Sequence, residues 1–252
     1  MGVRIEAAGS AAVVVMDWPE RRNALRPEDG EEVAAAIGAA GQTAASAIIL
    51  TGIGAFCAGG DLRTFAELSA RLTPAEIAEQ VYGRIQAMIR ALRHCPVPTI
   101  AAVDGPAIGL GFDLALACDM RIVGPHGWFR QGWARAGLIA GTGGIGLLAR
   151  RAPGVSWRLI ATQEKVTVEH CSQLGLGEVA SGGALPAAIE RAGDLAAIDR
   201  TVLGHYCRME RELTWPDDDF FAETARVQAS LIASAQFREL AARALGTAVT
   251  VA

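Results

Sequence analysis

Short apolar runs punctuated by turn residues mark the first half of the chain. Residues 11–17, 47–50, 99–103 and 120–123 are each rich in alanine, valine, isoleucine or leucine, and each run ends within two residues of a glycine, proline or charged residue. Runs of this length, bounded by residues that favour turns, are typical of buried strands. The pattern therefore predicts at least four short strands before residue 124.

Longer helical patterns separate these strands and fill the chain after residue 123. Thr73, Pro74 and Glu76 form a capping box with proline at the first helical position, which predicts that a helix begins there. The predicted helices span residues 27–40, 62–72, 74–92, 110–118, 143–152, 155–162, 167–174, 185–197, 198–213, 217–230 and 235–245. Strands alternating with helices, followed by helices alone, predict an α/β core with a helical C-terminal extension.

Residues 98–119 combine a strand, a glycine turn and a buried helix. After the strand at 99–103 come Gly109, Leu110 and Gly111, and then an apolar run rich in leucine and alanine that predicts a helix starting near Leu110. The first N–H groups of a helix lack internal partners and carry partial positive charge. Such a corner can bind an anion or stabilise an oxyanion that forms during a reaction.

Asp113 lies three residues beyond Leu110, on the same face of the predicted helix. We expect its carboxylate above the Leu110 N–H, where it could transfer protons. An acid in the first turn can also serve only to complement the helix dipole.

A second stretch, residues 51–62, has the same strand, glycine and helix order. Ala58, Gly59 and Gly60 are small, so a ligand can approach the backbone closely. Asp61 precedes the helix at 62–72 and is predicted to be its N-cap.

Four motifs in order carry a family resemblance: RRNAL at 21–25, FCAGGDL at 56–62, IAAVDGPAIGLGFDLALACD at 100–119 and GLIAGTGG at 137–144. Together they resemble the enoyl-CoA hydratase/isomerase (crotonase) superfamily over residues 12–180. The resemblance implies a crotonase-like spiral of ββα units in residues 1–195. It also implies a helical C-terminal region in residues 196–252 that mediates homotrimers or dimers of trimers.

The same resemblance implies an acyl-CoA thioester substrate, with coenzyme A as part of the substrate and no separate cofactor or metal. The N–H groups of Ala58 and Leu110 would hold the thioester oxygen while Asp113 acts as acid or base. Substrate and CoA contacts would come from Arg22, Ala24, Leu25, Ala58, Gly59, Gly60, Asp61, Leu62, Gly109 and Trp133.

The acids of this chain differ from those of a hydratase of the family. Such hydratases use two glutamates, at the positions that Asp113 and Trp133 occupy here. Hydration needs one group to activate water and a proton for the α-carbon, whereas moving a double bond needs one proton shuttle. The resemblance therefore predicts that the protein is a hydratase or an isomerase that works through an enolate.

Three alternatives stay open. If Arg130 or Arg135 faces the acyl pocket, it could bind a second carboxylate of the substrate, which would suit a decarboxylase. The loss of the second glutamate would also suit a catalytically weak binding protein of crotonase fold. A nicotinamide enzyme would need residues 141–146, GTGGIG, as a dinucleotide loop; because no clean strand precedes them, close helix packing explains these glycines better.

Charge and cysteine content narrow the possible ligands and the cellular compartment of the protein. A net charge of −4 without a basic cluster argues against nucleic-acid binding. The five cysteines form no CxxC pair, so we expect reduced, buried thiols and a cytoplasmic protein. The apolar run at 11–16 is too short for a signal or a membrane span.

Overall fold

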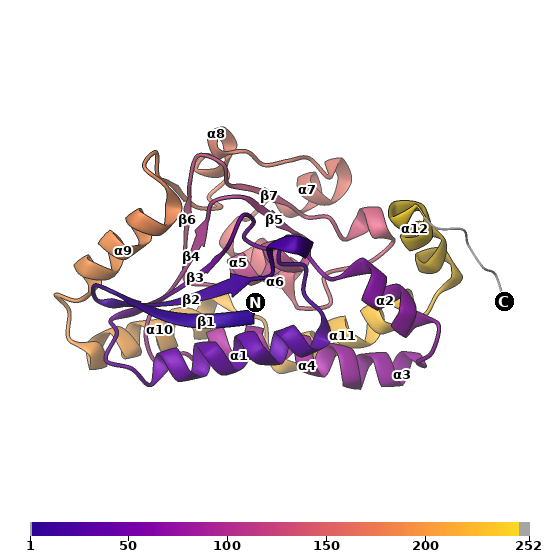
Figure 1. The fold of residues 1–252 in the computed structure, drawn as a ribbon, viewed down its shortest axis with the longest axis horizontal. Coiled ribbons are helices and arrows are strands. Elements are labelled where there is room, and N and C mark those ends of the chain that lie inside the picture. The colour runs from indigo at the N-terminus through magenta and orange to yellow at the C-terminus, as the bar shows by residue number, and fades with distance from the viewer. Residues whose placement is uncertain (1, 247–252) are drawn as a thin grey trace.

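A six-stranded sheet forms the centre of the molecule in the computed structural model, which describes residues 2–246 (Figure 1). Its order is β1-β2-β3-β4-β6-β8, with β1 antiparallel to β2 and every other neighbouring pair parallel. The strands are β1 (Gly2–Ala8), β2 (Ala11–Asp17), β3 (Ala47–Gly52), β4 (Thr99–Val103), β6 (Met120–Val123) and β8 (Glu178–Val179). The four strands predicted from the sequence are confirmed.

A second, two-stranded parallel sheet pairs β5 (Pro106–Ile108) with β7 (Trp128–Arg130). These strands are only three residues long, and their apolar pattern is too short to predict them. Phe129 of β7 stacks on Phe112, with ring centroids 4.9 Å apart, so this small sheet packs against the helix that follows β5.

The helices confirm the predicted α/β core with a helical C-terminal region. They are α1 (Pro27–Gly41), α2 (Leu62–Ser69), α3 (Pro74–Glu76), α4 (Gly83–Arg93), α5 (Leu110–Ala117), α6 (Gly144–Arg151), α7 (Ser156–Thr162), α8 (Val168–Cys171), α9 (Ala184–Leu195), α10 (Arg200–Thr214), α11 (Asp218–Ile232) and α12 (Ala235–Leu245). A π-helical segment, Ile77–Tyr82, joins α3 to α4, so the helix predicted at 74–92 is one helical stretch with a widened middle. The predicted capping box of Thr73 and Glu76 is present.

Alternate side chains of the strands enter two separate parts of the core, as the two-residue period of a strand requires. Val14 and Met16 of β2 face the larger cluster, which includes residues of α1, α4 and α5. Val13 and Val15 face a smaller cluster that the alanines of α9 complete. The sheet is thus covered on one face by α9 and on the other by α1, α4 and α5 (Figure 1).

The division at residue 195 stays a prediction, and residues 247–252 of the predicted C-terminal region lie outside the described residues. Among the residues that the structure describes, no helix is both long and apolar enough to cross a membrane.

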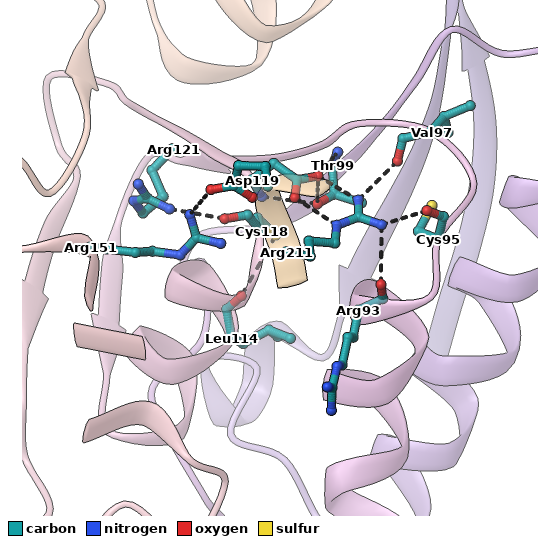
Figure 2. Close-up of polar contacts among 11 residues, drawn as sticks. Arg93, Cys95, Val97, Thr99, Leu114, Cys118, Asp119, Arg121, Arg151 and Arg211 are labelled. Carbon is teal, nitrogen blue, oxygen red and sulfur yellow. Dashed lines mark hydrogen bonds and ion pairs between the residues drawn. The ribbon is translucent and has the colours of Figure 1, made fainter. Parts of the chain in front are cut away.

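Arg211 anchors α10 to the core through a buried network (Figure 2). Its guanidinium donates to both carboxylate oxygens of Asp119, at 2.8 and 2.6 Å, and to the carbonyls of Arg93, Cys95 and Val97. Burial lowers the pKa of Arg211, but the hydrogen bonds and negative charge of Asp119 outweigh it and raise that pKa. Because Asp119 follows α5 closely, this network links the C-terminal helices to the end of α5.

We predict that Arg211→Leu lowers the free energy of unfolding by about 3–5 kcal/mol, since it leaves the Asp119 carboxylate largely buried without its partner. Urea titrations at equal protein concentration measure the change. The matched control is Arg208→Leu, because the ion pair of Arg208 with Glu212 is mostly exposed and should contribute at most about 1 kcal/mol. Equal losses in the two variants would contradict the anchoring role.

Candidate active site

The two glycine stretches that the sequence singled out lie against each other. The Cys57 N–H donates to the Pro106 carbonyl, and the Ile108 N–H donates to the Cys57 carbonyl, each at 3.0 Å. A Cβ atom on Gly111 would lie only 2.2 Å from the Cys57 carbonyl oxygen, which no side chain tolerates. The first turn of α5 therefore packs directly on the segment after β3, and only glycine at position 111 allows it.

The start of α5 presents the free N–H groups that the sequence predicts. Gly109 precedes the helix with φ 52°, a left-handed conformation that glycine adopts without strain, and its own N–H donates to the Arg130 carbonyl. Within the described residues, the Leu110 N–H has no hydrogen-bond acceptor. The Leu110 side chain is fully buried in the main hydrophobic core, so the polar group that Leu110 itself offers at this corner is its N–H.

The Ala58 N–H differs from the expectation of a free donor, because it already donates to the Arg22 carbonyl at 3.0 Å. Asn23 fixes this arrangement: its side chain accepts from the Trp18 N–H at 2.8 Å and donates to the Ala55 carbonyl at 2.7 Å. A ligand oxygen that used the Ala58 N–H would have to share it with Arg22 or displace the Arg22 carbonyl.

Asp113 is the buried acid of the site, with 3% of its surface exposed. Its Oδ2 accepts hydrogen bonds from the Trp133 indole N–H at 2.8 Å and from the Thr142 hydroxyl at 2.6 Å. Oδ1 has no hydrogen-bond partner within the described residues. The hydrogen bonds of Asp113 thus go to Trp133 and Thr142, and the position of its carboxylate above the Leu110 N–H stays a prediction.

The pKa of Asp113 is raised to about 7. Burial is the main cause, because it disfavours the charged carboxylate, and the hydrogen bonds from Thr142 and Trp133 oppose it by favouring that form. Near neutral pH the group is thus present in both protonation states. A carboxyl group in this condition can both accept and return a proton.

The segment around residues 21–25 lies beside the first glycine stretch. The Leu25 N–H donates to the Gly59 carbonyl, and the Asp61 N–H donates to the Leu25 carbonyl, each at 2.8 Å. Ala24 and Leu62 are half-buried at this junction, and Gly60 pairs with Leu25 in a parallel bridge. The structure therefore brings the predicted binding segments 22–25 and 58–62 together.

Arg21 and Arg22 have different surroundings. Arg21 is half-buried, pairs with Asp29 and lies over the Trp18 ring at 4.6 Å, so it holds the loop in place. Arg22 is exposed and has no side-chain partner within the described residues. Arg22 is thus the cation of this loop that is free to meet a ligand.

Asp61 is the N-cap of α2, as predicted: its carboxylate accepts from the Thr64 N–H at 2.8 Å.

The five cysteines are free and buried, also as expected.

Comparison with known proteins identifies the family. The model of the enoyl-CoA hydratase/isomerase family matches residues 6–239. This chain belongs to the enoyl-CoA hydratase/isomerase family.

Curated relatives agree with this assignment. The chain is 34% identical over 200 residues to the probable enoyl-CoA hydratase EchA6 of Mycobacterium bovis, with 77% of this chain and 78% of the relative covered. It is 31% identical over 179 residues to the short-chain-enoyl-CoA hydratase of Clostridium acetobutylicum, with 69% of this chain and 66% of the relative covered.

Solved structures show the same fold. The enoyl-CoA hydratase of Bacillus halodurans superimposes with a TM-score of 0.87 at 20% identity, covering 96% of this chain and 100% of that one. An enoyl-CoA hydratase/isomerase family protein of Hyphomonas neptunium superimposes with a TM-score of 0.78 at 30% identity, covering 89% of this chain and 88% of that one. The fold is thus that of the crotonase superfamily, as predicted.

Two members of the site were not singled out from the sequence. Thr142 donates to Asp113, and Gly144 lies so close that a Cβ there would be 1.9 Å from Asp113 Oδ1. Both lie in the glycine-rich segment 141–146, where added Cβ atoms would also meet Gln228, Phe221 and Pro216. Close packing therefore accounts for these glycines, as the sequence analysis favoured. Thr142 is the one polar side chain within this glycine-rich segment, and that feature could have pointed to it.

The two arginines considered for a second substrate carboxylate have different surroundings. The Arg130 guanidinium stacks on the Trp128 ring at 5.3 Å, on the same face of β7. Arg135 is exposed in a 3₁₀ turn. Within the described part of the chain, neither guanidinium hydrogen-bonds to Asp113 or Trp133, and their role with a substrate carboxylate stays a prediction.

We predict that Gly144→Ala destabilises this hydratase/isomerase family member by about 1–3 kcal/mol, because the added methyl group overlaps the Asp113 carboxyl. Chemical denaturation measures the loss. In an Asp113→Ala background the cost should fall below about 0.5 kcal/mol, since the methyl group then has room.

Gly38→Ala in α1 is the control for helix propensity, because nothing lies within 4 Å of its added Cβ. It should stabilise the protein by about 0.5–1 kcal/mol. A Gly144→Ala cost that stays unchanged without the Asp113 carboxyl would show that the contact is not the cause.

Proposed function

We propose that this enzyme moves the double bond of an enoyl-CoA thioester through an enolate, with Asp113 as its single acid and base. The observation that carries the proposal is one buried carboxyl with a pKa of about 7, located in the first turn of a helix whose leading N–H is free. The comparisons support the coarser class, an acyl-CoA enzyme of the hydratase/isomerase family.

The proposed reaction begins when the Leu110 N–H donates a hydrogen bond to the thioester carbonyl oxygen. One such main-chain donor is typically worth about 3–4 kcal/mol in the transition state. The Ala58 N–H serves as the second donor once it shares its hydrogen with the ligand as well as with the Arg22 carbonyl. Both donors are main-chain groups, so neither requires a particular side chain.

Proton transfer then passes through Asp113 alone. The ionised carboxylate removes a proton from the α-carbon of a 3-enoyl thioester, and the electron pair of that C–H bond moves into the conjugated enolate. The protonated carboxyl next returns the proton to the γ-carbon. The electrons return from the oxygen to give the 2-enoyl thioester, so the balance needs no water and no second acid.

Hydration is the second candidate and receives less support from the site. Trp133 occupies the position of the second glutamate of hydratases, and its indole N–H is committed to Asp113. Within the described residues, no other carboxylate hydrogen-bonds to Asp113, Trp133 or Thr142. A hydratase reaction would therefore require Asp113 both to activate water and to protonate the α-carbon. The alternatives of a decarboxylase or of a catalytically weak acyl-CoA binding protein remain predictions.

Coenzyme A binding is proposed for the segments 22–25 and 58–62. Exposed Arg22 suits a phosphate of the coenzyme A portion, and the main chain at half-buried Ala24 and buried Leu25 is proposed to meet its adenine end. No cofactor besides this part of the substrate enters the proposal.

Self-association as a homotrimer or a dimer of trimers also stays a proposal. Its support is an apolar stripe on α10, where Val202, Tyr206, Met209 and Leu213 are all exposed and share one face of the helix.

We predict that Asp113→Asn lowers kcat/KM for 3-enoyl-CoA isomerisation at least about 100-fold, because the amide can neither accept nor return the proton. Initial rates on 2-enoyl-, 3-enoyl- and dienoyl-CoA thioesters test this, with water addition followed separately on the 2-enoyl substrates. Asp194→Asn is the matched control, since Asp194 is exposed and its carboxylate pairs only with Arg191 among the residues that the structure describes. Unchanged turnover in Asp113→Asn would remove Asp113 from the mechanism, and faster hydration than isomerisation by the wild type would favour the second candidate.

A further inference from the structure

The two hydrogen bonds to Asp113 converge on one of its oxygens. Trp133 and Thr142 come from separate parts of the chain, yet both donate to Oδ2, at 2.8 and 2.6 Å. Distances this short are typical of hydrogen bonds to a charged group. Oδ1 is left without a partner in the described part of the chain.

The two donors are held rigidly. Trp133 is 5% exposed and its ring lies beside Gly109, where an added Cβ would be 3.5 Å from the ring. Thr142 is fully buried between glycines that pack on Gln228 and Phe221. The oxygen that faces these donors therefore accepts two hydrogen bonds, and the other oxygen, which lies against Gly144, has no hydrogen-bond partner in the described part of the chain.

We propose that Trp133 and Thr142 are positioning residues that hold Oδ2 of Asp113, so that Oδ1 is the oxygen that transfers the proton. This inference deepens the proposed function and rests on it. It gives Trp133 a role in this chain that differs from that of a second acid. The tryptophan orients and tunes the remaining carboxyl instead of supplying its own proton.

The surroundings of Asp113 allow this role to be measured through its pKa. The titratable groups that face it are Cys57, from the segment after β3, and Tyr82, from the π-helical segment. Burial raises the pKa of both, that of Cys57 to about 12, so both are neutral at pH 7. The hydrogen bonds from Thr142 and Trp133 are the interactions that lower the pKa of Asp113 against its burial.

The sign of the effect follows. Removing a donor to Oδ2 destabilises the ionised carboxylate and so raises the pKa of Asp113. A hydrogen bond to a charged group is typically worth about 1.5–3 kcal/mol, which corresponds to an upward shift of about one to two pH units.

The experiment titrates Asp113 directly, by NMR of protein labelled with ¹³C at the aspartate carboxyl carbons, with Asp113→Asn used to assign the signal. Trp133→Phe keeps the ring and removes the N–H, and Thr142→Val keeps the shape and removes the hydroxyl. Both variants should raise the midpoint by at least about one pH unit. Thr142→Ser, which keeps the hydroxyl, should restore it to near the wild-type value. Trp157→Phe and Thr162→Val are matched controls on exposed side chains and should leave it unchanged.

A second readout uses turnover. The midpoint of the rise in kcat/KM with pH should move upward with the NMR midpoint, so that Trp133→Phe loses about tenfold at pH values below both midpoints and recovers at high pH. A merely structural role would lower activity equally at all pH values.

The outcomes separate the two proposals. An unshifted NMR midpoint in both Trp133→Phe and Thr142→Val overturns the positioning role, even where the wild type isomerises enoyl-CoA. If Trp133→Phe does not fold, Thr142→Val and Thr142→Ser decide the matter alone. Shifted midpoints in a protein that turns over no member of the substrate panel would support the hydrogen-bond arrangement and overturn the proposed reaction.

Discussion

The close approach of Gly111 to the carbonyl of Cys57 is the constraint on which the site depends. Because position 111 has no side chain, the first turn of α5 can lie directly against the segment that follows β3. Two main-chain hydrogen bonds, from Cys57 to Pro106 and from Ile108 to Cys57, fix the register of this contact. This contact sets the positions of the free Leu110 N–H and of the Asp113 carboxyl, which lie one turn apart on α5.

The environment of Asp113 combines two opposing effects. Its burial between α5 and α6 raises the pKa, and the donors Trp133 and Thr142 hold the rise to a value near 7. Glycines at 141, 143, 144 and 146 let α6 and α11 approach closely enough to close this part of the molecule. Arg211 and Asp119 connect the same helix α5 to α10 at its other end, so the C-terminal helices contribute to the position of the acid.

Much of the fold could be predicted from the sequence because its main elements are long and their patterns local. Four of the six strands of the large sheet, β2, β3, β4 and β6, and helices such as α1, α5 and α12 follow from apolar patterns and capping residues, whereas β1 and β8 were not predicted. Strands β5 and β7 could not be predicted, since three residues give too little pattern and their pairing joins distant segments. Asp113 and Trp133 were singled out from motif positions, but their hydrogen bond was not, because it depends on how the 131–142 segment folds over α5. The Ala58 N–H shows the same limit: its hydrogen bond to Arg22 comes from a tertiary contact that no local pattern encodes.

The central claim is that the α5 corner and Asp113 together generate an enolate, and exchange of α-protons tests it most directly. A saturated acyl-CoA thioester incubated with the enzyme in D₂O can exchange its α-protons but cannot isomerise or add water, so mass spectrometry reports enolate formation alone. The account predicts deuterium incorporation at the α-carbon by the wild-type enzyme and at least about a 100-fold slower rate in Asp113→Asn. Binding of the thioester without exchange, or equal exchange by the wild type and Asp113→Asn, would contradict it.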